Sequence, residues 1–150
     1  MSNRPSWHQY FLTITRQVAE RSTCLRAKVG AVIARDRNIV ATGYNGSPAG
    51  LPHCTEVGCL IYESRTPSGE MEENCFRTIH AEINAIAQAA KNGVSIDGAD
   101  IYITHSPCMH CLKVLLNTGL KRICFGEFYR DQRIFEVAQE LSIELIHLQS

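Results

Sequence analysis

Apolar residues near the start of the chain recur every three or four positions, the spacing that places them on one face of an α-helix. They are Trp7, Tyr10, Phe11, Ile14 and Val18. We therefore predict an amphipathic helix over about residues 5–22. Two short apolar stretches rich in β-branched residues follow, at 29–34 and 39–42, and residues 36–38 between them are typical of a turn. These two stretches predict a β-hairpin.

The pattern breaks from Gly43 to about Thr78, where Gly, Pro, Ser, Asn and charged residues dominate. We expect a long loop here, and a loop of this length inside a compact domain is usually functional or held by a metal. Regular patterns then return as a helix from near His80, a strand at 100–104, a helix opened by Pro107, a strand at 122–125, a helix at 134–141 and a strand at 143–146. This order predicts one α/β domain over residues 1–150, layered around a central sheet.

Composition narrows the classes of partner. Fifteen basic residues balance fifteen acidic ones, so no long-range positive field attracts a nucleic-acid polymer. No apolar run approaches the ~20 residues that a membrane helix needs. The residues from Met1 to Trp7 lack the apolar core of a signal peptide. We therefore expect a cytoplasmic protein without a membrane or nucleic-acid partner.

The chain contains seven cysteines and six histidines. In a reducing compartment, cysteines in such numbers favour metal binding or catalysis over a disulfide framework. An odd count also suits a metal protein with one spare buried thiol, and Cys124, in an apolar strand, is interpreted as that core thiol.

The strongest chemical signal is His80-Ala81-Glu82 followed by Pro107-Cys108-Met109-His110-Cys111. This H-x-E and P-C-x-x-C pair is typical of zinc-dependent deaminases. Cys108 and Cys111 share a first helical turn, so together with His80 they are predicted to bind one zinc ion. Three protein ligands leave the fourth position open to water, as in catalytic sites. Glu82 is predicted to accept the water proton and later to protonate the leaving amine.

Each part of this pattern has an ordinary alternative. An isolated C-x-x-C could be a redox pair or half of a structural zinc site. His80 alone could be a capping or core histidine, and Glu82 alone is an ordinary acid of a first helical turn. The combination favours the catalytic interpretation over these alternatives. His110, between the two cysteines, is interpreted as a bystander.

The sequence resembles the deoxycytidylate (dCMP) deaminases, zinc-dependent enzymes of the cytidine and deoxycytidylate deaminase family. Beyond the zinc motifs, the resemblance rests on residues 21–24, 28–33, 43–50, 75–86 and 102–108. It implies a three-layer α/β/α fold with a five-stranded mixed sheet, and hydrolysis of dCMP to dUMP and ammonia for thymidylate synthesis. It also implies a homo-hexamer that dCTP activates and dTTP inhibits, with Mg²⁺.

Three residues are candidate substrate contacts. Asn45, in a glycine-flanked turn, could contact the nucleotide or an effector, or could serve only as a turn residue. Arg26 could bind the 5′-phosphate as a fork. Tyr129 could close over the sugar or phosphate. For Arg26 and Tyr129 a surface or interface role is an equal alternative.

Some members of the family carry a second, structural zinc. The predicted ligands here are Cys24, His53, Cys59 and Cys75, and Cys54 could replace a neighbour. Such a site would fix a loop with little apolar content of its own. The alternative is a set of free thiols.

Two other functions compete with dCMP deamination. The first is deamination of another substrate, such as cytidine, guanine, a riboflavin precursor or adenosine in tRNA. Neutral charge disfavours tRNA, and the Gly43-Tyr44-Asn45-Gly46 segment disfavours the others. The second is a non-catalytic role, since a similar protein is encoded in a bacterial competence operon. Glu82 argues against it, because a purely structural zinc module needs no proton shuttle.

Overall fold

The computed structural model describes residues 3–129 and 131–148, and it is built on a five-stranded sheet with the order β2-β1-β5-β6-β7. The strands are β1 (Gly30–Arg35), β2 (Asn38–Tyr44), β5 (Asp100–His105), β6 (Arg122–Glu127) and β7 (Glu144–His147). β1 is antiparallel to both β2 and β5, whereas β5, β6 and β7 are parallel. The predicted five-stranded mixed sheet is confirmed.

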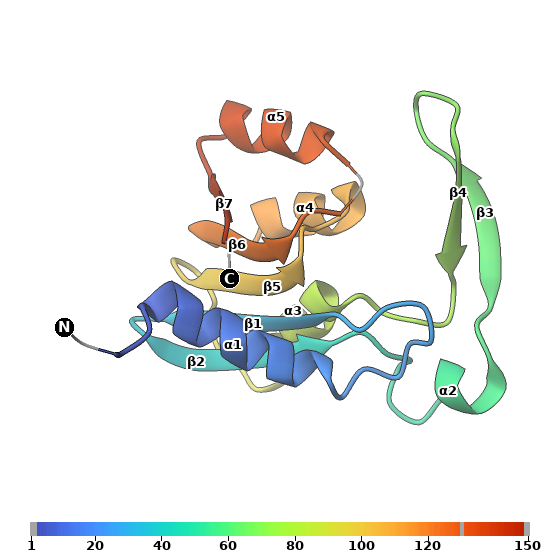
Figure 1. Cartoon of the computed structure of the whole chain (residues 1–150), viewed down its shortest axis with the longest axis horizontal. Helices are drawn as coiled ribbons and strands as arrows, with labels where there is room; N and C mark the ends of the chain where they lie inside the picture. Colours follow the sequence, from blue (N-terminus) through green and yellow to red (C-terminus); the bar gives the residue numbers. More distant parts are fainter. Residues whose placement is uncertain (1–2, 130, 149–150) are drawn as a thin grey trace.

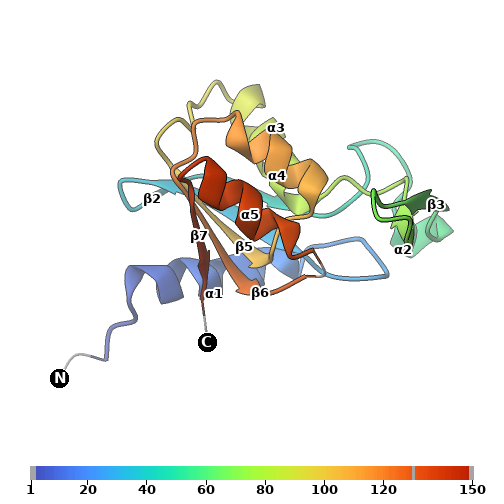
Figure 2. The same ribbon diagram turned by 90° about the horizontal axis from the view of Figure 1, so that it is seen from above.

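Helices cover both faces of this sheet. α1 (Trp7–Ala19) lies on one face, and α3 (Ala81–Lys91), α4 (Met109–Leu116) and α5 (Arg133–Glu140) lie on the other (Figures 1 and 2). The arrangement forms the predicted α/β/α layers. Among the described residues, no helix has the length and apolar character needed to cross a membrane.

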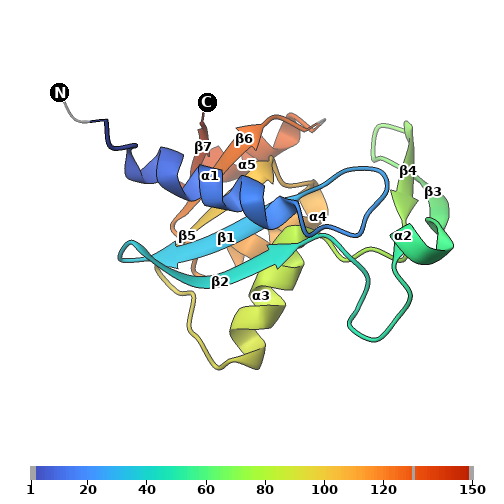
Figure 3. The ribbon, with the colours of Figure 1, turned by 60° about the horizontal axis from the view of Figure 1, so that its bottom comes forward.

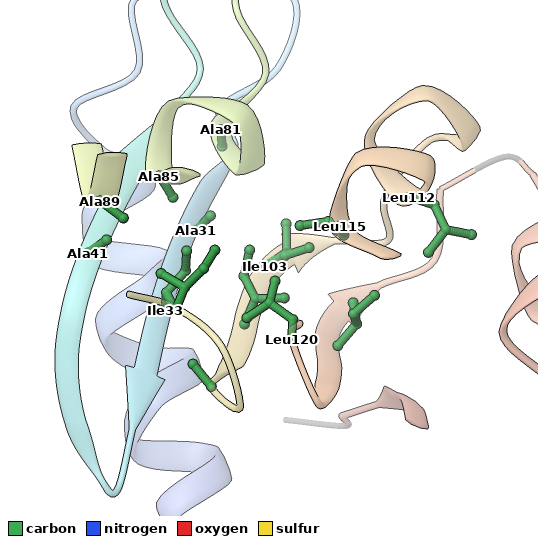
Figure 4. Close-up of a cluster of buried hydrophobic side chains, with 14 of the residues drawn as sticks. Ala31, Ile33, Ala41, Ala81, Ala85, Ala89, Ile103, Leu112, Leu115 and Leu120 are labelled. Carbon is green, nitrogen blue, oxygen red and sulfur yellow. The ribbon is translucent and has the colours of Figure 1, made fainter. Parts of the chain in front are cut away.

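The apolar core is divided by the sheet into two clusters. Phe11, Val32 and Tyr102 belong to the smaller cluster, on the α1 side. The larger cluster lies under α3, α4 and α5, and small side chains let α3 approach the sheet closely (Figure 4). Ala81 and Ala85 of α3 are fully buried in it. A Cβ atom added to Gly43 of β2 would overlap the Ala81 carbonyl oxygen and the Ala85 nitrogen, so β2 needs a glycine at this crossing.

Substituting Gly43 by alanine is therefore expected to lower the free energy of unfolding by about 1–3 kcal/mol, because α3 would have to move away from β2. Thr42→Ala is the matched control, since Thr42 is the exposed neighbour in the same strand and its change should cost about 0.5 kcal/mol or less. Urea unfolding of both variants measures the difference. Equal stability of the two variants would contradict the close approach.

The segment predicted as a long loop contains regular structure of its own. A one-turn helix, α2 (Cys54–Val57), precedes a two-stranded hairpin of β3 (Ile61–Arg65) and β4 (Met71–Cys75). The hairpin stands beside the main body at the end near the carboxyl-terminal edge of β2 (Figures 1 and 3). Gly46 and Ile79 form a two-hydrogen-bond bridge, with N···O distances of 3.1 and 2.8 Å, at the base of this excursion. The expectation of a single long loop from Gly43 to about Thr78 is therefore wrong.

Candidate active site

Two helix N-termini bring the motif residues together. His80 is the N-cap residue of α3, and Cys108 is the N-cap residue of α4. The Cys108 sulfur accepts a hydrogen bond from the backbone N–H of Cys111 at 3.5 Å, which places both thiols in the first turn of α4. Because α3 and α4 cover the same face of the sheet side by side, the two halves of the motif meet although 28 residues separate them (Figure 2).

The three side chains have the spacing of a metal site. The His80 Nδ1 atom lies 3.2 Å from the Cys111 sulfur and 3.7 Å from the Cys108 sulfur. All three ligand atoms lie within 4.8 Å of one another. Ligands of one tetrahedral zinc ion, with Zn–S and Zn–N bonds of ordinary length, stand roughly 3.6 Å apart. The donor set of one imidazole and two thiols therefore fits zinc.

Local electrostatics favour a metal-binding thiolate. Hydrogen bonding with the Cys111 thiol, and with the His80 ring, holds the pKa of Cys108 well below its usual value. The N-terminus of α4 adds the positive end of a helix dipole. The deprotonated sulfur is the form that binds a metal.

Glu82 lies in the first turn of α3, and only 4% of its surface is exposed. Burial raises the pKa of Glu82, because the protein interior solvates a carboxylate charge poorly, while the nearby His80 ring acts in the opposite direction. A carboxyl group with a raised pKa, next to candidate metal ligands, has the properties of a group that exchanges protons at neutral pH.

His80, Glu82 and Cys108 line a cavity of about 300 Å³, and His80, Cys108 and Cys111 also line an adjoining cavity of about 920 Å³. His105 and Ser106 line the 300 Å³ cavity together with His80, Glu82 and Cys108. The volume lies at the lower end of the range typical of small-molecule sites. The 300 Å³ cavity therefore suits a small ligand that presents one reactive group to His80, Glu82 and Cys108.

All three predicted substrate contacts line this cavity, in different ways. Asn45 is 6% exposed, and its side chain forms hydrogen bonds within the protein. Its side-chain oxygen accepts from the Val29 backbone N–H at 2.9 Å and from the Ser22 hydroxyl at 2.5 Å. Its side-chain amide donates to the Ala27 carbonyl at 2.8 Å. Asn45 therefore shapes the turn as well as facing the cavity. Arg26 is exposed and donates to the Glu73 carbonyl at 3.3 Å.

The backbone of Tyr129 is bonded to Ser106, a residue outside the two zinc motifs. The Ser106 hydroxyl accepts from the Tyr129 backbone N–H at 2.5 Å and donates to its carbonyl at 3.2 Å. Ser106 and His105 directly precede Pro107, so their position beside the P-C-x-x-C motif was the available signal. The contact of Ser106 with residue 129 depends on the parallel pairing of β5 and β6, which the motif does not contain.

A second group of thiols lies at the base of the hairpin, and it shares Cys59 and Cys75 with the predicted set. Cys54, Cys59 and Cys75 have their sulfur atoms within 4.8 Å of one another, with Cys54 and Cys75 at 3.7 Å. Cys24 and His53 are not members of this group. The Cys24 sulfur accepts from the Arg26 backbone N–H at 3.4 Å, in the wall of the 300 Å³ cavity.

The start of α2 separates the surroundings of His53 from those of Cys54. His53 is its N-cap residue, and the ring bonds with the Thr23 hydroxyl at 3.0 Å. Cys54 starts the helix and points inward, with 1% of its surface exposed. Burial alone would raise the pKa of Cys75, but hydrogen bonds from Thr78 and from backbone N–H groups outweigh it and lower the pKa to about 6. These three thiols remain candidates for a second metal.

The layered sheet, with a His–Cys–Cys cluster beside a buried carboxyl group, defines a hydrolytic enzyme of the zinc-dependent deaminase class. Sequence comparison agrees with this class. The chain belongs to the cytidine and deoxycytidylate deaminase family, since the family model described as "Cytidine and deoxycytidylate deaminase zinc-binding region" matches residues 5–127.

Individual relatives support the same assignment. The chain is 44% identical over 149 residues to ComE operon protein 2 of Bacillus subtilis, covering 97% of this chain and 74% of that protein. It is 33% identical over 143 residues to the deoxycytidylate deaminase of Schizosaccharomyces pombe, covering 95% of this chain but only 44% of that enzyme. A crystal structure of the dCMP deaminase of cyanophage S-TIM5 in complex with dCMP and dUMP superposes with a TM-score of 0.78, at 29% identity, covering 98% of this chain and all of that one.

Proposed function

We propose that the protein converts dCMP and water to dUMP and ammonia. The observation that carries the proposal is the buried Glu82 carboxyl group, which shares one small cavity with His80 and Cys108. Relatives named deoxycytidylate deaminase, and a structure of similar fold that holds dCMP and dUMP, support this substrate. The product dUMP would then serve thymidylate synthesis in the cytoplasm.

Each group in the cavity has a defined task in this proposal. His80, Cys108 and Cys111 would hold a zinc ion, which would supply the Lewis acidity that makes water nucleophilic at neutral pH. The Glu82 carboxylate would take a proton from the attacking water and deliver it to N3 of the cytosine ring as the water oxygen forms a bond to C4. Glu82 then moves the second water proton to the exocyclic amine, so that ammonia leaves as the C4 carbonyl forms.

The wall of the cavity positions the nucleotide. The Arg26 guanidinium is exposed at the rim, where it can bind the 5′-phosphate by paired hydrogen bonds. Tyr129, whose backbone is held by Ser106, also lines the cavity and could contact the sugar or phosphate. Asn45 presents its backbone turn to the sugar, because its side-chain atoms are already bonded to Ser22, Ala27 and Val29.

Assay of the purified protein tests the proposal. We expect ammonia release and dUMP formation from dCMP, with much slower reaction of cytidine, which lacks the phosphate, and none of adenosine in tRNA. Guanine and a riboflavin precursor are assayed as the remaining competing substrates. Absence of release from every substrate by zinc-loaded protein would instead favour a non-catalytic role, which the name of the Bacillus subtilis relative makes the second candidate.

We further propose that the enzyme forms a homo-hexamer and that dCTP activates it and dTTP inhibits it with Mg²⁺. Sedimentation in the presence and absence of each nucleotide measures the assembly. Initial rates of dCMP deamination measure the regulation. Unchanged rates with both effectors would remove regulation from the proposal without affecting the catalytic site.

A second zinc at Cys54, Cys59 and Cys75 is also part of the proposal. Metal analysis is expected to find about two zinc ions per chain, one at each cluster. Cys59→Ser should lose one ion, since a serine hydroxyl is a poor zinc ligand. Cys24→Ser is the matched control and should keep both, because Cys24 lies outside the group. Loss of zinc from the control would restore the ligand set predicted from sequence.

A further inference from the structure

A second cavity of about 360 Å³ lies at the other end of the sheet from the candidate active site. The active-site cavity is lined by His105, at the end of β5, whereas the second cavity is lined by Asp100 and Arg122, the first residues of β5 and β6. The start of α1 and the β1–β2 turn complete it. Figure 3 shows this turn and the N-terminal end of α1 at the end of the molecule away from α2 and β3–β4.

Positive charge gathers in this cavity although the whole chain is neutral. Its charged lining residues are Arg35, Arg37, Lys121, Arg122, Asp36 and Asp100. Within the described chain, Arg122 pairs with Asp100 at 3.3 Å, and Arg35 donates to the Ser95 carbonyl. Neither Arg37 nor Lys121 forms a salt bridge with another described residue. Four positive side chains therefore face two negative ones, Asp36 and Asp100, and the cavity has an excess of two positive charges.

The β1–β2 turn carries an arginine, Arg37, at a position where the backbone conformation favours glycine. Arg35 pairs with Asn38, so Asp36 and Arg37 form a two-residue hairpin loop, with φ angles of 52° and 64°. Loops of this kind prefer glycine at the second position, and a left-handed conformation costs other residues about 1–2 kcal/mol. The guanidinium of Arg37 lies 5.0 Å from the ring centre of Trp7, at the cavity wall.

We propose that this cavity binds a small anion with two or three linked phosphate groups. Arg37 and Lys121 bring unpaired positive charge, and arginine matches phosphate oxygens in pairs while lysine acts as a point charge. A single phosphate fills only part of 360 Å³, so a phosphate chain matches the volume better. The chain could be inorganic or part of a nucleotide, with the exposed Trp7 ring available to an attached base.

The proposal is independent of the deaminase activity, and Trp7 reports on it directly because it is the only tryptophan in the chain. Titration with sodium tripolyphosphate is expected to change Trp7 fluorescence saturably, since the anion draws Arg37 away from the indole ring. Inorganic phosphate should bind more weakly. A nucleoside triphosphate arm distinguishes the sources: tighter binding than tripolyphosphate indicates a nucleotide, and equal binding indicates recognition of the phosphate chain alone.

Three variants locate the binding. Lys121→Gln leaves Trp7 and Arg37 intact and should weaken tripolyphosphate binding about tenfold, because a charged hydrogen bond is lost. Lys91→Gln removes the same charge at the exposed end of α3 and should have no effect. Arg26→Gln, in the active-site cavity, should also leave the Trp7 signal unchanged. A Trp7 signal that never saturates, or that Lys121→Gln and Lys91→Gln affect equally, would overturn the proposal.

Discussion

Glu82→Gln is expected to abolish nearly all dCMP turnover while the fold and zinc content stay unchanged. Glutamine has the shape of glutamate but cannot take or return a proton, and general acid–base catalysis contributes about 10²–10⁴ in rate. Glu82 is 4% exposed, so no bulk water can replace it easily as a proton carrier. The loss should appear in kcat, because Glu82 acts on the reacting atoms.

The control for this variant is Glu136→Gln, the same substitution in the first turn of α5, where the side chain is exposed. It should keep the normal rate. Steady-state rates, zinc analysis and circular dichroism on both proteins complete the comparison. If Glu82→Gln turned over dCMP at a near-normal rate, the proton-transfer role would have to be given to another group.

Cys108→Ala is expected to lose the catalytic zinc and, with it, all measurable turnover. Its sulfur is one of only two in the cluster, and the remaining imidazole and thiol make a weak site. The sulfur also caps α4 through the Cys111 N–H, so a modest loss of stability should accompany the loss of metal.

His110→Ala provides the matched control, because His110 lies between the two cysteines but is exposed and outside the cluster. Metal analysis should find the catalytic zinc in this variant at the normal level. Together, the Glu82 and Cys108 variants separate two defects: the first keeps zinc without turnover, and the second loses both. Zinc retained by Cys108→Ala at full occupancy would show that the ion is held elsewhere.

Much of this architecture follows from local sequence pattern. The period of apolar residues predicts α1, and the β-branched runs predict β1 and β2, because each element buries one face or both in the core. His80 and the P-C-x-x-C segment begin helices as expected, since each precedes a run of helical periodicity. The helix ends differ from the predicted ones by a few residues, as is usual where helices fray.

The parts that sequence could not provide depend on contacts between distant segments. The β3–β4 hairpin has no fully buried side chain, and no alternation of apolar and polar residues marks it. The position of Cys54 in the thiol group depends on where α2 begins, and the sequence of a one-turn helix does not indicate its start. The hydrogen bonds between Ser106 and the Tyr129 backbone can form only when β5 and β6 are paired.

The bridge between Gly46 and Ile79 allows the segment between these two residues to change in length within the family. Because residues 47–78 begin and end next to this bridge, residues can be added to or removed from the segment without altering the spacing of β2 and α3. Insertions would therefore lengthen an appendage and leave His80 in place. Evolution could in this way remodel the surface around the nucleotide repeatedly while the chemistry beneath it stayed the same.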